Sequence, residues 1–365
     1  MRILVTGGAG FIGSNFLNML VPRYPAHSFV ALDKLTYAGN PLSVADLEGA
    51  KNFALEVGDI ADADTVARVF DQHRPDVVVH FAAETHVDRS IVDPTEFVRT
   101  NVVGTLQLLN ACKTRWKGEG PRRFHHVSTD EVYGSLGDDD PAFTEDTRYD
   151  PSSPYAASKA SSDHLVRAFH RTYGLPITVT NCSNNYGPRQ APEKLIPLTI
   201  LNALDGRELP VYGTGRNCRD WLYVEDHCEA VWAVIERGVP GRTYNVGGGE
   251  ERRNIDLVRT IGQLVAEETG RPEAEILGLI RFVEDRPGHD WRYAVDSSKL
   301  RAELGWAPRV ELPAALRRTL RWYMSNPAWV ESMRGGEHDR WMEKNYEGRQ
   351  QLGSAAGTHH GRTER

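Results

Sequence analysis

The stretch that decides the fold is MRILVTGGAGFIG, residues 1–13, in which an apolar run is followed at once by Gly7, Gly10 and Gly13. The apolar run predicts a buried strand, and the pattern over 11–20 predicts a helix that starts at the glycine turn. Glycines at this spacing permit a tight turn and close helix–sheet packing, and the start of a helix offers unpaired N–H groups to an anion. The stretch is therefore typical of a unit that holds the pyrophosphate of a dinucleotide.

Asp33 ends the next apolar run, twenty residues beyond Gly13. A carboxylate at this place can accept hydrogen bonds from the hydroxyls of an adenine ribose, and its charge would repel a 2′-phosphate. This favours NAD over NADP, although the neighbouring Lys34 leaves NADP open. The competing interpretation is an ordinary tight turn with a capping aspartate. The strand before the glycines and the helix after them favour the dinucleotide.

Outward from this unit, short apolar runs alternate with helical patterns through the first half of the chain. Strands are predicted at 2–6, 29–33, 53–57, 76–81, 124–128 and 176–181. Helices are predicted at 11–20, 63–72, 94–116 and 154–173. Such alternation predicts an α/β fold of the Rossmann type, in which helices cover both faces of a doubly wound parallel sheet.

The regular alternation of strands and helices ends at about residue 182. Beyond it, loops rich in Gly, Pro, Asn and Arg separate helices predicted at 194–205, 224–237, 254–268 and 313–324. We predict an NAD-binding Rossmann domain over 1–182 and a smaller, mixed C-terminal substrate domain over 183–345. The stretch 224–247 is a candidate to return to the first domain. The tail 350–365 lacks periodicity and large apolar groups, which predicts disorder.

Composition excludes several classes of protein. The 365 residues carry a formal net charge of -7 and no long basic run, so we expect no nucleic-acid partner. No apolar stretch is long enough for a membrane span, and the glycine-broken N-terminus is unlike a signal peptide. No metal site is expected either, because the adjacent His125 and His126 would point to opposite faces of a strand. A reduced, cytoplasmic protein is indicated by four cysteines without a C-x-x-C pair, Cys112, Cys182, Cys218 and Cys228.

Two short motifs carry the candidate chemistry. Tyr155 and Lys159 form Y-x-x-x-K on a predicted helix, where they share one face, and the ammonium is expected to lower the pKa of the tyrosine. Thr129, Asp130 and Glu131 follow a predicted strand and should reach the same crevice. The competing interpretation of the acidic pair is a solvated turn with capping carboxylates. Its place at the end of a parallel strand favours a catalytic pair.

Together with these motifs, a set of longer stretches resembles the dTDP-glucose 4,6-dehydratases, within the extended short-chain dehydrogenase/reductase superfamily. They cover residues 1 to about 325 and include TGGAGFIGSNF, LDKLTYAGN, VGDI, HFAAETHVDRS, STDEVYG, SPYAASKASSDHLV, CSNNYGPRQ, PEKLIP, GRNCRDWLYVEDH, YNVGGG and RPGHDWRYAVD. Related epimerases and decarboxylases share the glycine turn and Y-x-x-x-K but generally lack the Thr-Asp-Glu triplet.

The resemblance implies a hydro-lyase that makes a nucleotide-linked 4-keto-6-deoxyglucose, as in deoxysugar biosynthesis, with tightly held NAD. In this scheme Tyr155 takes the proton of the sugar 4-hydroxyl as hydride leaves carbon 4, and Thr129 positions that hydroxyl. Glu131 then removes the carbon 5 proton, Asp130 protonates the departing hydroxyl of carbon 6, and hydride returns to carbon 6. Open alternatives are a UDP-glucose 4,6-dehydratase, a 4-epimerase, a decarboxylase and a non-catalytic dinucleotide sensor.

The expected cofactor site combines the residues reasoned above with those that the resemblance adds. It comprises Gly7, Gly10, Phe11, Ile12, Gly13, Asp33, Lys34, Thr36, Asp59, Ile60, Phe81, Ala82, Ala83, Thr100, Tyr155, Lys159 and Asn184. For Asp59 an alternative stays open, namely that it caps the helix predicted near Ala63.

A nucleotide diphosphate needs cations and backbone donors, and the resemblance supplies further pocket residues. The expected substrate site comprises His86, Asp88, Thr129, Asn184, Glu193, Lys194, Arg219, Asn254, Arg286 and His289. For any single cation the alternative is a surface salt bridge.

The resemblance also implies a homodimer that pairs through the helices predicted at 94–116 and 154–173. Their apolar residues include Val102, Leu106, Leu109, Leu165, Val166 and Phe169. The alternative is that these side chains pack against the sheet of the same chain.

Overall fold

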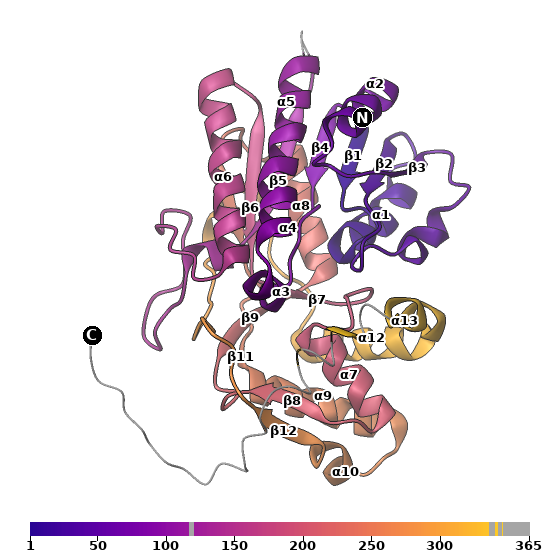
Figure 1. Ribbon diagram of the computed structural model, residues 1–365, viewed down its shortest axis with the longest axis vertical. Coiled ribbons are helices and arrows are strands. Elements are labelled where there is room, and N and C mark those ends of the chain that lie inside the picture. The colour runs from indigo at the N-terminus through magenta and orange to yellow at the C-terminus, as the bar shows by residue number, and fades with distance from the viewer. Residues whose placement is uncertain (117–119, 336–339, 342–344, 346–365) are drawn as a thin grey trace.

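The fold is organised around one large parallel sheet, whose strands lie side by side in the upper half of Figure 1. The computed structural model describes residues 1–116, 120–335, 340–341 and 345, so the tail predicted at 350–365 lies outside the described residues. The sheet has seven strands, and every pairing in it is parallel. In spatial order they are β10 (Thr243–Val246), β6 (Ile177–Cys182), β5 (Arg123–Thr129), β4 (Val77–His80), β1 (Arg2–Thr6), β2 (Ser28–Asp33) and β3 (Phe53–Val57).

This strand order confirms the predicted Rossmann-type sheet. The chain runs outward from β1 to β2 and β3, and then crosses back to β4 on the other side of β1. A crevice that receives ligands forms at such a switch point, beyond the carboxyl ends of the strands. The glycine turn, Asp33 and the Thr-Asp-Glu triplet all follow strands of this sheet, so the topology gathers them at one edge.

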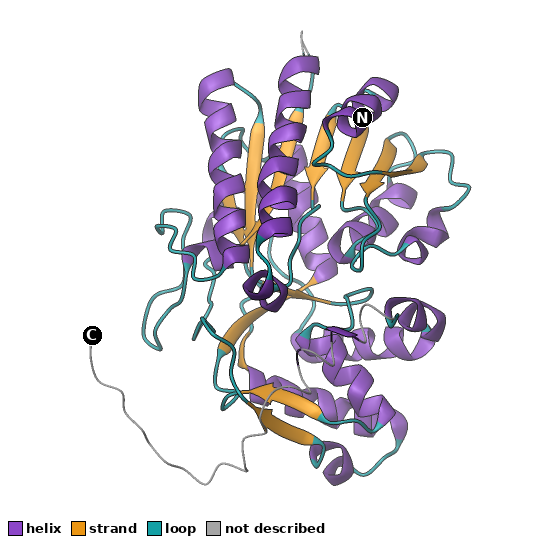
Figure 2. Cartoon of the chain, viewed as in Figure 1, coloured by secondary structure: helices purple, strands orange, loops and turns teal. Residues whose placement is uncertain are grey.

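Helices cover both faces of the sheet, as Figure 2 shows. Apolar side chains of α2 (Ala63–His73), α5 (Thr105–Arg115) and α6 (Pro154–Tyr173) pack on one face. Those of α1 (Phe11–Arg23) and α8 (Val224–Arg237) pack on the other. Residues at the two ends of α6 determine where this helix begins and ends. The hydroxyl of Ser153 accepts a hydrogen bond from the backbone N–H of Ala156, and Gly174 closes the helix at φ 69°.

The helix predicted over 94–116 is confirmed as a continuous helical segment, but its middle is not a regular α-helix. The segment consists of α4 (Thr95–Phe97), a π-helical stretch η2 (Val98–Gly104) and α5. The side chain of Asn101, on η2, is bonded to the backbone of Glu84 and donates to Ser158 Oγ at 2.8 Å. Periodicity could not reveal this irregularity, because it depends on a contact with α6 that lies far away in the chain. Single π turns are frequent beside functional sites.

The C-terminal part forms a smaller lobe below the carboxyl edge of the sheet (Figures 1 and 2). One small sheet has β11 (Glu251–Arg253), β9 (Cys218–Tyr223) and β7 (Asn184–Tyr186), with antiparallel and parallel pairing, and another has β12 (Ile280–Val283) and β8 (Leu209–Tyr212). Its helices are α7 (Leu195–Asp205), α9 (Asn254–Thr269), α10 (Glu273–Leu277), α12 (Leu312–Ser325) and α13 (Pro327–Met333). This confirms a smaller mixed part beside the Rossmann sheet.

The remaining elements are short connections. They are the 3-10 helices η1 (Pro41–Leu47) and η3 (Asp130–Tyr133) and the helices α3 (Val87–Val92) and α11 (Ser298–Leu304). No helix in the described ranges is both long and apolar enough to cross a lipid bilayer.

One buried histidine predicts a pH dependence of stability. His227 on α8 is fully buried, neither of its ring nitrogens has a hydrogen-bond partner among the described residues, and burial lowers its pKa to about 3. The unfolded chain binds this proton below its ordinary pKa of about 6.5, whereas the folded chain does not. Stability is therefore full above that pH and falls toward lower pH, by at most about 1.4 kcal/mol per pH unit.

We expect His227→Leu to reduce this dependence, because the leucine has no proton to bind. The remainder should come from the other buried histidines with lowered pKa values, His80, His86, His125 and His126. The measurement is the difference in melting temperature between about pH 7 and about pH 5, followed by circular dichroism. His164→Leu, at an exposed position of α6, is the matched control and should keep the wild-type difference. An equal difference in wild type and His227→Leu would show that another group is responsible.

Candidate active site

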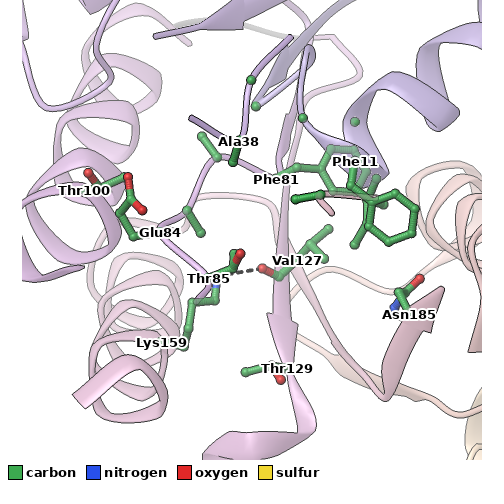
Figure 3. Close-up of a pocket in the computed structure, with 18 of the residues that line it drawn as sticks. Phe11, Ala38, Phe81, Glu84, Thr85, Thr100, Val127, Thr129, Lys159 and Asn185 are labelled. Atoms are coloured by element: carbon green, nitrogen blue, oxygen red, sulfur yellow. Dashed lines mark hydrogen bonds between the residues drawn. The ribbon is translucent and has the colours of Figure 1, made fainter. Parts of the chain in front are cut away.

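A deep cavity lies at the carboxyl edge of the large sheet, and all residues expected to bind the cofactor line it. From the glycine turn to the next strands these are Gly7, Gly10, Phe11, Ile12, Gly13, Asp33, Lys34, Thr36, Asp59 and Ile60. From the other side of the switch point they are Phe81, Ala82, Ala83, Thr100, Tyr155, Lys159 and Asn184. Figure 3 shows part of this lining, with Phe11 and Phe81 on one side and Thr100 and Lys159 on the other.

The glycine turn has no space for side chains. Gly7 has φ +70°, and a Cβ there would lie 2.7 Å from the backbone nitrogen of Ala82. A Cβ on Gly13 would lie 2.1 Å from the carbonyl oxygen of Gly7, so α1 can approach the turn only as long as this position is glycine. The N-cap residue of α1, Gly10, has no side chain that could cap the helix. The first N–H groups of α1 are therefore available to an anion, as a pyrophosphate requires.

Asp33 closes the far end of this cavity. Its two carboxylate oxygens accept hydrogen bonds from the backbone N–H groups of Ala9 and Leu35, both at 2.9 Å. Burial raises the pKa of Asp33, and these N–H groups oppose the rise. The carboxylate is thus held in a fixed orientation, with lone pairs left for ribose hydroxyls.

Asp59 does not cap the helix that follows it. The N-cap residue of α2 is Asp62, whose carboxylate accepts hydrogen bonds from the first turn. Asp59 instead lies 3.0 Å from Lys34 Nζ and 2.8 Å from Arg99 Nη2 on the cavity wall. The capping alternative for Asp59 is therefore wrong.

The Thr-Asp-Glu triplet lies where β5 ends and η3 begins, inside the cavity wall rather than on a solvated turn. Asp130 is 1 % exposed. Thr129 Oγ1 donates to Asp130 Oδ1 at 3.3 Å, and Asp130 Oδ2 has no partner among the described residues. Burial, then the charge of Glu131, raises the pKa of Asp130 well above its ordinary value. Burial thus favours the protonated form of Asp130.

Glu131 lines both this cavity and a second one beside it. Burial raises the pKa of Glu131, whereas the charges of Arg286, Lys194 and Arg219 lower it. The pKa of Glu131 stays raised overall, but three cations act on Glu131 whereas Arg219 is the main cation that acts on Asp130, so the two neighbouring acids experience different surroundings. Such a difference lets one carboxyl act as an acid and the other as a base.

Tyr155 and Lys159 project from α6 into the first cavity. Lys159 Nζ donates to the carbonyl of Val127 at 2.8 Å, drawn as a dashed line in Figure 3. The prediction of a lowered pKa for Tyr155 is wrong. Burial, followed by the charge of Glu131, raises the pKa of Tyr155 well above its ordinary value. Burial disfavours the charged phenolate, and the main groups that shift this pKa do not include Lys159.

The second cavity lies between the carboxyl edge and the smaller lobe. It is lined by His86, Asp88, Asn184, Glu193, Lys194, Arg219, Asn254, Arg286 and His289, which is every expected substrate residue except Thr129 of the first cavity. Arg219 is 5 % exposed, and Arg286 Nη1 contacts Asp88 Oδ1 at 3.0 Å with both side chains largely buried. The surface salt-bridge alternative is therefore wrong for these two arginines.

The comparisons with known proteins agree with this geometry. The sequence profile of the family described as GDP-mannose 4,6 dehydratase matches residues 4–319. A dTDP-glucose 4,6-dehydratase of Shigella flexneri is 53% identical over 363 residues, covering 96% of this chain and all of that protein. The chain belongs to the dTDP-glucose 4,6-dehydratase family.

Solved structures of dehydratases have the same fold. The dTDP-glucose 4,6-dehydratase of Streptomyces venezuelae, solved with NAD bound, superposes with a TM-score of 0.84 at 46% identity, covering 92% of this chain and all of that one. The enzyme of Bacillus anthracis in complex with NAD gives 0.81 at 41% identity, with coverage of 92% and 100%.

Unpaired polar atoms show what kind of ligand fits these two cavities of the dehydratase fold. Buried polar groups are almost always hydrogen-bonded, so a cluster of buried polar atoms without partners indicates a ligand site. The following atoms line the two cavities and have no hydrogen-bond partner within the described ranges: Asp130 Oδ2, Asn184 Oδ1, Asn185 Oδ1, Gln190 Oε1, His86 Nδ1, Asn254 Oδ1 and Arg286 Nε. A dinucleotide and a nucleotide sugar would supply the missing donors and acceptors.

Sequence reasoning missed several residues of these cavities. Glu84, Thr85, Asn185 and Gln190 lie in their walls, and all four belong to stretches that carry the dehydratase resemblance. For Glu84, Thr85 and Asn185 the available signal was their place next to an expected residue. Gln190 lies three positions before the expected Glu193. Tyr212 also lines the second cavity, from β8, and nothing in the local sequence singled it out. The described residues include no cluster of His, Cys, Asp or Glu placed to hold a metal ion.

Proposed function

We propose that the protein is an NAD-dependent dTDP-glucose 4,6-dehydratase, a hydro-lyase that converts dTDP-glucose into dTDP-4-keto-6-deoxyglucose and water. The observation that carries the proposal is the buried Asp130–Glu131 pair, in the same cavity as Tyr155 and Lys159. Elimination of water needs an acid and a base beside an oxidising site, and these four side chains supply that set.

Support for the cofactor comes from the glycine turn and from Asp33. The N–H groups at the start of α1 would hold the pyrophosphate and Asp33 the adenine ribose, with Lys159 at the nicotinamide ribose. When bound, NAD supplies the acceptor for the hydride of carbon 4 and later the donor for carbon 6.

Residues of this chain carry the protons. Tyr155 takes the proton of the sugar 4-hydroxyl, and Thr129 orients that hydroxyl. The resulting ketone acidifies carbon 5, so Glu131 can remove the carbon 5 proton. Asp130, kept protonated by burial, gives its proton to the leaving hydroxyl of carbon 6. After the second hydride transfer, carbon 5 takes up a proton and the 4-keto group remains.

The second cavity suits the nucleotide end of the substrate. Arg219 and Arg286 would contact the diphosphate, and Asn254 and His289 lie beside them. Lys194 lines both cavities, and Glu193, His86 and Asp88 line the second one. The hexose would lie beside Glu193 and Lys194. Asn184 lines both cavities and would meet the sugar and its diphosphate.

A 4-epimerase or a decarboxylase of the same superfamily would share the cofactor site and Tyr155. Neither needs a protonated carboxylic acid beside a second carboxyl group, because neither expels a hydroxyl from carbon 6. The high pKa of Asp130 therefore favours the dehydratase.

The test is incubation of the purified protein with dTDP-glucose and, separately, UDP-glucose, with products analysed by mass. We expect dTDP-glucose to lose one water and give a product with the alkaline ultraviolet absorbance of a 4-keto-6-deoxy sugar. Faster conversion of UDP-glucose would contradict the assigned base. A product of unchanged mass would point to an epimerase, and no turnover of either sugar would favour a dinucleotide sensor.

The proposal also includes a cytoplasmic homodimer and a division into an NAD-binding part, 1–182, and a sugar-binding part, 183–345, with 224–247 returning to the first. Pairing of β10 with β6 supports that return. Exposed Val98 and Val103 on η2 support the dimer. Leu109, Val166 and Phe169 do not contribute to that surface, because they are buried in the core of the same chain.

A further inference from the structure

The mechanism above does not use the buried carboxylate of Asp163. Asp163 lies on α6, four residues beyond Lys159, and its side chain has no exposed surface. Ser128 Oγ donates to Asp163 Oδ2 at 2.9 Å, and the hydroxyl of Tyr149 donates to the same oxygen at 2.8 Å. A buried charge is costly unless it is paired and hydrogen-bonded, so this carboxylate needs a cation.

The groups that face Asp163 come from four segments. β5 contributes Ser128 and His126, whose Nε2 lies 3.1 Å from Asp163 Oδ1, and β6 contributes Asn181. The loop before α6 contributes Tyr149. Burial lowers the pKa of His126 to about 4, so this ring is neutral near pH 7. Two permanent cations on α6 remain, namely Lys159 and Arg167.

Arg167 is already engaged elsewhere. Its Nη2 donates to the hydroxyl of Tyr149 at 2.6 Å and to Thr243 Oγ1 at 3.2 Å, so Tyr149 stands between Arg167 and the carboxylate. Lys159 has no comparable partner. Within the described residues its hydrogen-bond acceptor is the Val127 carbonyl, which is a dipole and carries no net charge. Residues four apart on a helix lie on the same face, and Lys159 and Asp163 contact the consecutive β5 residues Val127 and Ser128.

Burial lowers the pKa of Lys159, and the charge of Asp163 opposes that effect. Burial likewise raises the pKa of Asp163, while His126, Lys159 and Arg167 lower it by more. Each member of the pair thus favours the charged form of the other.

We propose that Asp163 is a positioning residue of the proposed dehydratase reaction, the buried counter-charge that keeps Lys159 protonated while Tyr155 exchanges a proton with the sugar. The inference rests on the function proposed above. In this scheme Tyr155 acts as the phenolate, a form that burial disfavours and that the charge of Lys159 must therefore stabilise. The phenolate takes the proton of the sugar 4-hydroxyl, and Lys159 keeps its own three protons throughout. Without the carboxylate, the buried ammonium would lose a proton and could no longer stabilise the phenolate.

The same carboxylate also joins the two catalytic segments. Ser128 directly precedes Thr129 on β5, and Asn181 Nδ2, 3.5 Å from Asp163 Oδ2, donates to the carbonyl oxygen of Thr129 at 3.1 Å. Asp163 therefore ties the strand end that carries Thr129 to the helix that carries Tyr155 and Lys159.

The test is the pH profile of kcat for Asp163→Asn. Asparagine has nearly the same shape, and its carbonyl can still accept from Ser128 and Tyr149, so mainly the charge is removed. Asp163 raises the pKa of Lys159, so its loss lets Lys159 deprotonate at lower pH. We expect the alkaline limb to move down by about one pH unit or more. KM for dTDP-glucose should change by less than about threefold, because the second cavity is untouched.

Tyr149→Phe is the matched control. It removes a hydrogen bond from the same oxygen without changing a charge, and its alkaline limb should stay within about 0.3 pH units of wild type. If the alkaline limb of the kcat profile of Asp163→Asn coincides with that of wild type, the proposal is wrong. An equal shift in Tyr149→Phe would also overturn it, since that would indicate a purely structural role.

A second readout does not depend on activity. Lys159→Met and Asp163→Asn each leave one buried charge unpaired, whereas the double variant leaves none. We expect the double variant to melt above both single variants, and to recover a folded protein if Asp163→Asn alone does not fold. A double variant that melts below both would refute the pairing. Failure of the wild type to convert dTDP-glucose would instead refute the proposed function and leave this melting test in force.

Discussion

Replacing Glu131 with glutamine yields a protein that binds and oxidises dTDP-glucose but eliminates water about 10² to 10⁴ times more slowly. The glutamine amide cannot take the proton from carbon 5. It has the same size as the glutamate and occupies the same place in the cavity wall, so the cavity keeps its shape. Because Tyr155 and Lys159 are intact, the first proton and hydride transfer still occur. The reaction then stops at the oxidised sugar, before the hydride can return.

The measurement is the near-ultraviolet absorbance of reduced nicotinamide after rapid mixing with dTDP-glucose. Wild type should show at most a transient signal, and Glu131→Gln a stable one that approaches one equivalent per site. Glu48→Gln, at an exposed position of the chain, is the matched control and should behave as wild type. Near-normal turnover of Glu131→Gln would remove Glu131 from its role as the base.

Replacing Tyr155 with phenylalanine has a different expected signature. The hydroxyl that takes the first proton is absent, so oxidation itself slows by about 10² to 10⁴ and reduced nicotinamide does not accumulate. Tyr155 is 7 % exposed and its ring lies 6.3 Å from that of Phe97, so phenylalanine keeps the packing. The affinity for dTDP-glucose should change little, because the diphosphate residues lie in the second cavity.

The matched control is Tyr173→Phe, at the exposed end of α6. Single-turnover traces of the two variants, measured under identical conditions, separate the roles. A stable reduced-nicotinamide signal in Tyr155→Phe would mean that another group takes the first proton. The opposite signatures at Tyr155 and Glu131 are what an oxidation followed by an elimination requires.

Local sequence was enough to predict the large sheet and the cofactor site at its carboxyl edge. Buried parallel strands read as continuous apolar runs, and a residue that follows such a strand must lie at the carboxyl edge. For this reason the sequence alone predicts that Asp33 and Thr129 lie at the carboxyl edge of the sheet. The glycine turn was equally readable, because a Cβ at Gly13 has no room beside the carbonyl of Gly7.

Other features depend on contacts between segments that are distant in the chain. The π-helical stretch η2 is tied to Ser158 through Asn101, and the wall position of Tyr212 depends on how β8 meets the second cavity. The high pKa of Tyr155 reflects burial, which spacing alone does not report. The hydrogen bonds of Asp163 could not be predicted either, because its partners Ser128 and Tyr149 precede it by 35 and 14 residues.

The most direct measurement of the central claim follows one hydrogen atom. dTDP-glucose carrying deuterium at carbon 4 is converted by the purified protein, and the product is examined by mass and by NMR. If one bound nicotinamide takes the hydride from carbon 4 and returns it within the same active site, the deuterium appears at carbon 6 of a product that has lost water. Deuterium that stays at carbon 4, or that is lost to solvent, would contradict the account.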